Sequence, residues 1–369
     1  MTAKQMQRAL ALAAQALRLS NPNPRVGCVI TSAAGEVLGE GFTQQAGGPH
    51  AEVMALRQAT ERGIDVSGAT AYVTLEPCSH HGRTGPCCDA LIQAGIRRVV
   101  ASLADPNPLV AGQGFARLQA AGMQVEVGPG AEASRELNIG FFSRMQRGRP
   151  WVRMKAATSL DGFTALPNGA SQWITSPEAR ADGHAWRARA CAVLTGIGTI
   201  LADDPHLNVR HIATRRQPHL AIVDSQLQTP PSARLFEVRQ REVLIYTASG
   251  DSTKAAALRD RGAQVIATPT ADNEHVNLRW VLQDLACQRS VNEVHVEAGA
   301  RLNGALVRDQ LVDEVLLYMA PTLLGAGLGM AQWGPLSTLD GAHTMAWHAV
   351  DQVGVDLRIV ARGVGRDVF

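Results

Sequence analysis

The sequence predicts an α/β protein of two domains, and three observations support this fold class. A chain of 369 residues is too long for one ordinary hydrophobic core. Short apolar runs alternate with amphipathic stretches, which is the pattern of strands and helices in layered α/β folds. The motifs that carry chemistry also change across Arg147-Gly148-Arg149-Pro150. We therefore expect one domain over residues 1–147 and a second over residues 150–369.

Composition excludes several classes of function. Hydrophobic residues make up 46% of the chain and charged residues 18%, as in folded globular proteins. A net charge of +2 and 4% aromatic residues argue against a nucleic-acid surface. No apolar run approaches the roughly 18 residues of a membrane span. Six cysteines, three of them in one motif, do not suggest a disulfide framework. We expect a reducing, cytoplasmic compartment.

The elements of the first domain follow from periodicity and from turn residues. The first 18 residues could mimic a targeting peptide, but Met6, Leu10 and Ala13 share one helical face and favour a docked surface helix. A hairpin is expected around Ala33-Ala34-Gly35. The expected strands are 26–31, 36–42, 70–75, 97–103 and 124–127, and the expected helices are 51–62, 87–94, 113–121 and 132–147.

The second domain begins with an alternating strand pattern at Trp151. Ser176-Pro177-Glu178 is a strong helix start, because serine caps the helix and proline suits its first turn. Strands are expected over 192–195 and 292–297, and each runs into a glycine-containing turn. Such turns allow phosphate to approach backbone N–H groups at a helix N-terminus. Ordinary tight turns would explain either one alone.

A metal-ligand pattern dominates the first domain. The pattern consists of His50-Ala51-Glu52 and, later in the sequence, Pro77-Cys78 and Pro86-Cys87. One imidazole and two thiolates occupy three positions around a tetrahedral zinc and leave the fourth open. Zinc lowers the pKa of water bound there, and zinc deaminases with a His-x-Glu…Pro-Cys signature use the resulting hydroxide on an amino-bearing ring carbon. In that class the glutamate carries the proton, which is the role expected of Glu52.

The choice among possible ligands rests on local geometry. His80, His81 and Cys88 are also competent donors nearby. We favour Cys78 and Cys87 because each directly follows a proline, and Pro86 can open a helix that starts at Cys87. Cys88 would then point about a third of a turn away. A structural zinc knuckle or plain buried cysteines are the alternatives.

The stretch from Cys78 to Cys87 resembles the pyrimidine deaminase half of the bifunctional riboflavin-biosynthesis deaminase/reductase family. Ser-His-His-Gly-Arg-Thr follows Cys78, and Asn21 to Cys28 and Asp105 to Pro108 also match. The resemblance implies a cytidine-deaminase-like fold for this domain. It also implies that Asn23 hydrogen-bonds the substrate, although capping a proline-bound turn is an equally good role.

The second domain resembles the reductase half of the same family, in Lys155 to Gly162, Ser171 to Thr175, Gly196 to Pro205 and Val296 to Gly299. That half has a dihydrofolate-reductase-like α/β fold and uses NADPH. By motif, the resemblance implies cofactor contacts at Ala157, Trp173, Thr199, Asp203, Ser225, Gly299, Ala300, Arg301, Leu302, Asn303, Gly304 and Ala305. It implies substrate contacts at Ser171, Arg187, Leu207, Arg210 and Glu297. Guanidinium groups match phosphate geometry, but two solvated arginines, and a helix stop at Asp203, are the alternatives.

The resemblance therefore implies a bifunctional enzyme with one Zn²⁺ per chain and NADPH. It would hydrolytically deaminate 2,5-diamino-6-(5-phosphoribosylamino)pyrimidin-4-one and then reduce the ribosylamino group to ribitylamino. The expected partner is this phosphorylated pyrimidine, with no nucleic acid or membrane, and we expect a homo-oligomer. Alternatives are a nucleic-acid or nucleotide base deaminase with an accessory domain, or a non-catalytic zinc-stabilised binding module.

Overall fold

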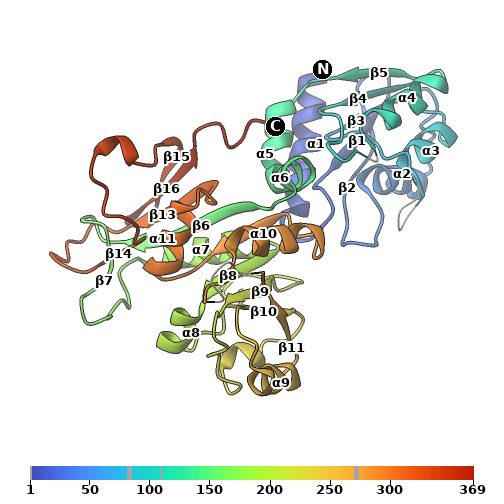
Figure 1. Cartoon of the computed structure of the whole chain (residues 1–369). Coiled ribbons are helices and arrows are strands. Elements are labelled where there is room, and N and C mark those ends of the chain that lie inside the picture. The colour runs from blue at the N-terminus through green and yellow to red at the C-terminus, as the bar shows by residue number, and fades with distance from the viewer. Residues whose placement is uncertain (1, 81–84, 109, 270–273) are drawn as a thin grey trace. The chain divides into compact units, whose positions relative to one another are not determined.

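The chain forms two compact units in the computed structural model, which describes residues 2–80, 85–108, 110–269 and 274–369. One unit ends at Gly148 and the other begins at Arg149 (Figure 1). Both units are mixed α/β, as predicted. None of the helices found over the described residues is long and apolar enough to cross a membrane.

The N-terminal unit is built on one sheet with the strand order β2-β1-β3-β4-β5. Strand β1 is antiparallel to both of its neighbours, β2 and β3, and β3, β4 and β5 are parallel to one another. The strands are β1 (Gly27–Thr31), β2 (Val37–Phe42), β3 (Thr70–Val73), β4 (Arg98–Ala101) and β5 (Gln124–Val127). The helices are α1 (Thr2–Gln15), η1 (Ala16–Arg18), α2 (Ala51–Glu61), α3 (Cys87–Gln93), α4 (Gln113–Ala120), α5 (Ala131–Leu137) and α6 (Ile139–Arg147).

Two helices cover opposite faces of this sheet, and glycines allow them to approach closely. A Cβ on Gly27 of β1 would lie 1.9 Å from the carbonyl oxygen of Ala9 in α1. A Cβ on Gly41 of β2 would lie 2.4 Å from the Met54 side chain in α2. Gly41 pairs with Cys28, the neighbour of Gly27, and adjacent residues of a strand face opposite ways. Helix α2, which follows His50 and carries Glu52, is thereby fixed on the face that Cys28 shares.

One sequence-based expectation was wrong in this unit. A single helix was predicted over residues 132–147, but α5 and α6 are separated at Asn138. The Asn138 side chain accepts the N–H of Arg25 at 2.7 Å and donates to the Arg25 carbonyl at 3.0 Å. A tertiary hydrogen-bond partner more than a hundred residues away therefore interrupts the helical pattern, because asparagine competes well for backbone groups outside a helix.

The C-terminal unit has a larger sheet with the strand order β11-β10-β9-β8-β12-β6-β13-β16-β15, and a small pair β14-β7. Strands from β11 to β13 in this order are parallel, and β16 and β15 add an antiparallel hairpin at one edge. The strands are β6 (Trp151–Thr158), β7 (Phe163–Ala165), β8 (Ala192–Gly196), β9 (His219–Val223), β10 (Val243–Thr247), β11 (Ala263–Ala267), β12 (Glu293–Val296), β13 (Glu314–Met319), β14 (Leu328–Gly329), β15 (Met345–Val353) and β16 (Asp356–Gly363).

Helices cover both faces of the larger sheet. They are α7 (Pro177–Arg189), α8 (Ile197–Asp203), α9 (Ser252–Asp260), α10 (Leu278–Cys287) and α11 (Ala300–Arg308), with the short η2 (Arg234–Glu237) and η3 (Leu339–Gly341). In β8, Ala192 and Leu194 belong to the apolar cluster that includes α10, whereas Val193 belongs to the cluster that includes α8 and α9. The alternation along the strand thus separates two cores. The Ser176 hydroxyl accepts the N–H of Ala179 at 3.2 Å and caps α7 as predicted.

Candidate metal centre and reductase site

His50, Cys78 and Cys87 come together in the N-terminal unit, although up to 37 positions separate them in sequence. His50 is the residue before α2, Cys78 lies in the loop after β3, and Cys87 is the first residue of α3. His50 Nδ1 lies 3.2 Å from Cys87 Sγ and 3.6 Å from Cys78 Sγ. The possible ligand atoms of all three residues lie within 4.8 Å of one another.

This donor set fits a zinc ion. A nitrogen and a sulfur bound to one tetrahedral zinc are roughly 3.5 Å apart, because their bonds to the metal are about 2.0 and 2.3 Å long. The observed separations bracket that value. One imidazole and two sulfurs also leave a fourth position for a reacting group, as in catalytic zinc sites.

Electrostatics prepare Cys78 to be a ligand. Hydrogen bonds from Cys87 and His50 lower the pKa of the Cys78 thiol to about 4. The backbone N–H of Cys87 also approaches Cys78 Sγ at 3.4 Å. The hydrogen bond to Cys78 in turn raises the pKa of His50. A sulfur that is already a thiolate can bind a metal without first losing a proton.

Glu52 lies in the first turn of α2 and only 3% of it is exposed. Burial raises the pKa of its carboxyl group, and its side chain interacts with Cys87. A carboxyl group that accepts a proton more readily than usual, next to a metal ligand, is suited to general acid–base work.

The competing donors are arranged differently. The Cys88 thiol donates to the Pro77 carbonyl at 3.2 Å and to the Gly114 carbonyl at 3.5 Å. Burial raises the pKa of Cys88 to about 12, so it stays a thiol. Among the described residues, the group that could hold a metal comprises His50, Cys78 and Cys87 without Cys88 or His80. His81, Arg83 and Thr84 lie outside the described residues.

Asn23 belongs to the turn that follows η1. Its N–H donates to the Ser20 carbonyl at 2.8 Å, and its own carbonyl accepts the Ser20 hydroxyl at 3.1 Å. These contacts account for the turn, and they leave the expected role of the Asn23 side chain in substrate binding as a prediction.

In the C-terminal unit, most of the expected cofactor residues follow the carboxyl ends of neighbouring parallel strands. Ala157 is near the end of β6, Thr199 follows β8, Ser225 follows β9 and Gly299 follows β12. These strands lie side by side in the order β9-β8-β12-β6, so their carboxyl ends meet at one edge of the sheet. Ligands of open α/β sheets bind at such an edge. Residues Gly299 to Ala305 contain the N-terminus of α11, and Asp203 ends α8.

Two further cofactor and substrate candidates lie in the segment between β7 and α7. Trp173 is 64% exposed, and the Arg180 guanidinium lies over its ring at 4.4 Å from the centroid. Ser171 is in the same segment and is half-buried. A large exposed ring on a cation is available for stacking, but the roles of both residues remain predictions.

The expected substrate residues include a buried cluster around Glu297. The Arg187 guanidinium donates to both carboxylate oxygens of Glu297, with Nη2 2.7 Å from Oε2. Although burial acts in the opposite direction, Arg187 lowers the pKa of Glu297 far below its usual value. Arg187 Nη1 also contacts the carbonyl of Asn208 at 2.5 Å, next to Leu207. Arg187 and Glu297 are therefore held as one unit.

Sequence reasoning missed His184 and Lys155, which complete this cluster. His184 Nδ1 lies 3.0 Å from Arg187 Nη1 and accepts the backbone N–H of Arg210 at 3.3 Å. Burial, reinforced by Arg187, lowers the pKa of His184 to about 3, so it is a neutral acceptor. Burial also lowers the pKa of Lys155, whose charge interacts with Glu297. The spacing of His184 three residues before Arg187 on α7 was the available signal.

The fold and the site define a class of enzyme: a zinc-dependent base deaminase joined to an α/β reductase. Residues 2–103 match the cytidine and deoxycytidylate deaminase zinc-binding region, and residues 150–352 match the RibD C-terminal domain. The chain is 44% identical to the riboflavin biosynthesis protein RibD of Escherichia coli K12 over 365 residues, covering 95% of this chain and 96% of that protein. The RibD of Aquifex aeolicus is 39% identical, with 96% of each chain covered.

Comparison with solved structures points to the same family. Acinetobacter baumannii RibD, form 1, superposes with a TM-score of 0.89 at 40% identity over 98% of each chain. A deaminase/reductase from Thermotoga maritima superposes with a TM-score of 0.87 at 32% identity over 98% of this chain and 99% of that one. This chain belongs to the RibD family of riboflavin biosynthesis proteins.

Membership confirms the predicted fold class and the predicted bifunctional activity. The protein is an enzyme of riboflavin biosynthesis with a deaminase and a reductase activity that act on small molecules. The two domains imply zinc and a nicotinamide cofactor. The alternatives of a nucleic-acid base deaminase and a non-catalytic zinc module are thereby set aside.

Proposed function

We propose that the domain over residues 1–147 deaminates 2,5-diamino-6-(5-phosphoribosylamino)pyrimidin-4-one, and that the domain over 150–369 then reduces the ribosylamino group to ribitylamino with NADPH. The Thermotoga maritima relative bears a name that specifies the corresponding deaminase and reductase substrates. The observation that carries the proposal is the convergence of His50, Cys78 and Cys87 beside the buried carboxyl group of Glu52.

In the deaminase, one zinc per chain would be held by His50, Cys78 and Cys87. Zinc supplies a Lewis acid that lowers the pKa of water at its open position. Glu52 takes a proton from the attacking water and delivers it to the departing amine. Its raised pKa suits both halves of this transfer, because a group too acidic to hold a proton cannot donate it. Asn23 orients the substrate by a hydrogen bond.

In the reductase, NADPH would lie along the carboxyl edge of β9, β8, β12 and β6. Its contacts are Ala157, Trp173, Thr199, Asp203, Ser225 and the α11 turn Gly299, Ala300, Arg301, Leu302, Asn303, Gly304 and Ala305. The task of the protein here is to align the nicotinamide with the sugar carbon that accepts the hydride.

The substrate would be bound by Ser171, Arg187, Leu207, Arg210 and Glu297. Because Arg187 is already paired with Glu297, its fork serves to hold that carboxylate in place. Arg210 is exposed and its guanidinium makes a long contact of 3.4 Å with Asn208 Oδ1. We propose that Arg210 binds the sugar phosphate. A guanidinium with few hydrogen bonds of its own can donate two parallel N–H bonds to a phosphate.

We propose that the protein is a homo-oligomer and works in the cytoplasm. The edge hairpin of β15 and β16 exposes Trp347 (74%), Val350 (56%) and Leu357 (40%), and apolar edges are usually covered in an assembly. None of the six cysteines forms a disulfide bond, which suits a reducing compartment. Light scattering on the purified chain should give a mass above 39.3 kDa, and a monomer would contradict the first proposal.

One incubation tests both activities. The purified enzyme is supplied with the diaminopyrimidinone phosphate, with and without NADPH, and products are identified by mass. Without NADPH we expect release of ammonia and accumulation of the ribosylamino uracil. With NADPH we expect the ribitylamino product. Reduction of the substrate before it loses its amine would overturn the proposed order of the two reactions. A parallel incubation with NADH in place of NADPH tests the cofactor, and reduction with NADH but not with NADPH would overturn the assignment.

A further inference from the structure

Glu76 is a buried carboxylate with no assigned role, two residues before Cys78, and only 4% of it is exposed. Its Oε2 accepts the backbone N–H groups of Asp105 and Gly112, each at 3.0 Å. Its Oε1 accepts those of Gly114 at 2.8 Å and Phe115 at 3.2 Å. One side chain thus holds four backbone donors, all from the segment that runs from the end of β4 into α4.

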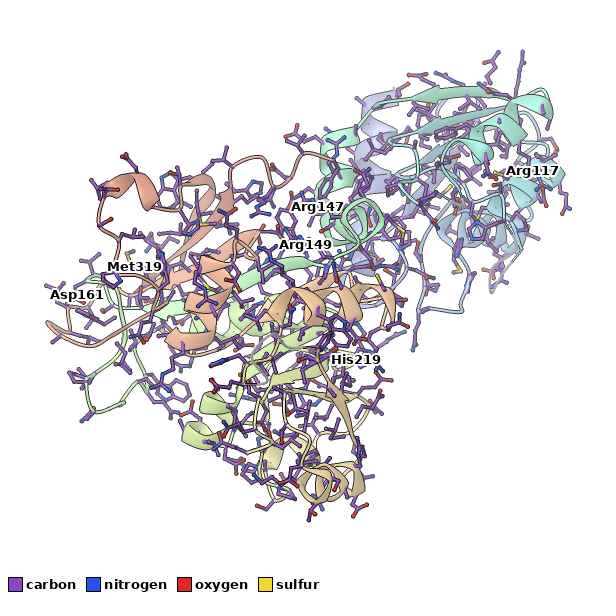
Figure 2. All side chains as sticks on the ribbon, in the orientation of Figure 1. Arg117, Arg147, Arg149, Asp161, His219 and Met319 are labelled. Carbon is purple, nitrogen blue, oxygen red and sulfur yellow. The ribbon has the colours of Figure 1, made fainter. Side chains whose placement is uncertain are left out.

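That segment holds the backbone on both sides of Cys78. The Pro77 carbonyl packs so closely on Gly114 that a Cβ there would lie 2.1 Å from it. The Cys88 thiol bridges the two, since it donates to the carbonyls of both Pro77 and Gly114. On the other side, Arg117 of α4 donates to the Ser79 carbonyl at 3.1 Å (Figure 2 labels Arg117). Pro77 is therefore anchored to Gly114, which Glu76 holds directly, and Ser79 is anchored to Arg117, two residues after Phe115 in the same helix.

A carboxylate suits this position better than any neutral group. Four N–H groups converge on it, so an acceptor with two oxygens and no donor is required. An amide of the same size would turn its own N–H₂ toward two of these donors and leave buried groups unsatisfied. The four backbone dipoles also stabilise the buried charge.

We propose that Glu76 is a positioning residue for the metal centre: through the backbone of Asp105, Gly112, Gly114 and Phe115 it holds Cys78 Sγ at the place where it meets His50 and Cys87. The proposal rests on the proposed zinc ligands. Residues outside the ligand shell that orient ligands typically change metal affinity by about 10- to 100-fold. The expected consequence of losing Glu76 is faster release of zinc, whereas the C-terminal reductase should be unaffected.

The test measures the rate at which zinc passes from the full-length, zinc-loaded protein to a chromophoric chelator, well below the unfolding temperature. Glu76→Gln should release zinc roughly 10- to 100-fold faster than the wild type. The matched control is Val100→Ala in β4, which removes volume from the core cluster of Met6, Val29 and Tyr72 and lowers stability without touching the Glu76 hydrogen bonds. Its release rate should stay near that of the wild type, and both variants should keep the reductase rate.

A second pair keeps the test decisive if Glu76→Gln does not fold. Arg117 and Arg98 are both partly exposed arginines of this unit, and each forms an ion pair, with Asp89 and Glu126 respectively. Of these two arginines, only Arg117 also has a hydrogen bond to the described part of the loop that carries Cys78, at the Ser79 carbonyl. Arg117→Ala should release zinc roughly two- to tenfold faster, the range expected from one net hydrogen bond, and Arg98→Ala should not.

The proposal is overturned if folded Glu76→Gln releases zinc at the wild-type rate, or if Val100→Ala accelerates release equally at the same loss of stability. Equal release from Arg117→Ala and Arg98→Ala would overturn it as well. Failure of the ligand assignment is distinguishable, because then Cys78→Ser would retain the zinc content of the wild type.

Discussion

Arg187 and Glu297 form a two-point ion pair in which Arg187 Nη2 lies 2.7 Å from Glu297 Oε2 and Nε contacts Oε1. The pair joins α7 to the end of β12, and His184 connects it to the backbone of Arg210. A guanidinium that is satisfied internally has little capacity left for a phosphate. The two arginines that the sequence treats as equivalent are therefore expected to have different roles.

Arg210→Ala should raise the KM for the phosphorylated reductase substrate about ten- to a hundredfold, because a charge-assisted hydrogen bond typically contributes about 1.5–3 kcal/mol. The KM for NADPH should change much less. Steady-state kinetics with each substrate varied in turn provide the measurement. Arg215→Ala, an exposed arginine five residues further on, is the control. An unchanged KM in Arg210→Ala would return Arg210 to the solvated surface.

Cys78→Ser and Cys87→Ser should each lose zinc, since a serine hydroxyl does not replace a thiolate as a zinc ligand. Cys88→Ser should keep it, because the Cys88 thiol donates to two carbonyls and a hydroxyl can do the same. Metal analysis of the purified variants, expected to show about one zinc per wild-type chain, provides the measurement. Zinc kept in Cys87→Ser but lost in Cys88→Ser would reverse the ligand assignment.

Glu52→Gln should retain zinc and fold normally, yet release ammonia at least about a hundredfold more slowly, because an amide cannot cycle a proton. Supplied with substrate that is already deaminated, this variant should oxidise the nicotinamide cofactor at the wild-type rate. Glu61→Gln, at the exposed end of the same helix, is the matched control and should leave both rates unchanged. A parallel fall in both activities of Glu52→Gln would mean that Glu52 has a structural role.

Cutting the chain near Gly148 should give two fragments that fold separately. Contacts divide the chain between Gly148 and Arg149, and the residues of each proposed site lie wholly on one side. The first fragment should bind zinc and release ammonia, and the second should reduce deaminated substrate. Circular dichroism and the two assays on separately expressed fragments are the measurements. Aggregation of both fragments would instead indicate a shared core.

Stability should fall as the pH decreases from about 6.5 toward 3, with a contribution from His295. Burial lowers the pKa of His295 to about 3, against about 6.5 in the unfolded chain. Between pH 3 and pH 6.5 His295 is protonated in the unfolded state but neutral in the folded state. Its contribution to the free energy of unfolding is therefore fully present above about pH 6.5 and decreases as the pH falls toward 3. Both ring nitrogens lack a hydrogen bond among the described residues.

His295→Leu should therefore flatten the dependence of the unfolding temperature on pH between 7 and 5, because leucine cannot take up the proton. Thermal unfolding of the full-length variants across this range is the measurement. His348→Gln, on the exposed face of β15, is the control and should preserve the slope. The same slope in His295→Leu as in the wild type would show that this histidine does not contribute.

The residues of the metal centre could be predicted from the sequence because they lie in short, recognisable motifs. The proline before each of Cys78 and Cys87, the start of a helix at Cys87 and the His-x-Glu spacing are short-range features, and the three side chains do converge. The helix capped by Ser176 was also predictable, since one hydroxyl and one nearby N–H decide it. Local rules succeed where the interacting atoms are a few residues apart.

Long-range partners could not be inferred in this way. The alternating strand pattern that begins at Trp151 does not reveal that Arg153 is fully buried between Glu293 and Glu314, which lie 140 and 161 positions away. The break at Asn138 depends on Arg25, and the four donors that Glu76 accepts come from residues at least 29 positions later. A buried charge is stable only where the fold supplies its counter-charges and donors, and a linear pattern does not reveal which distant groups these will be.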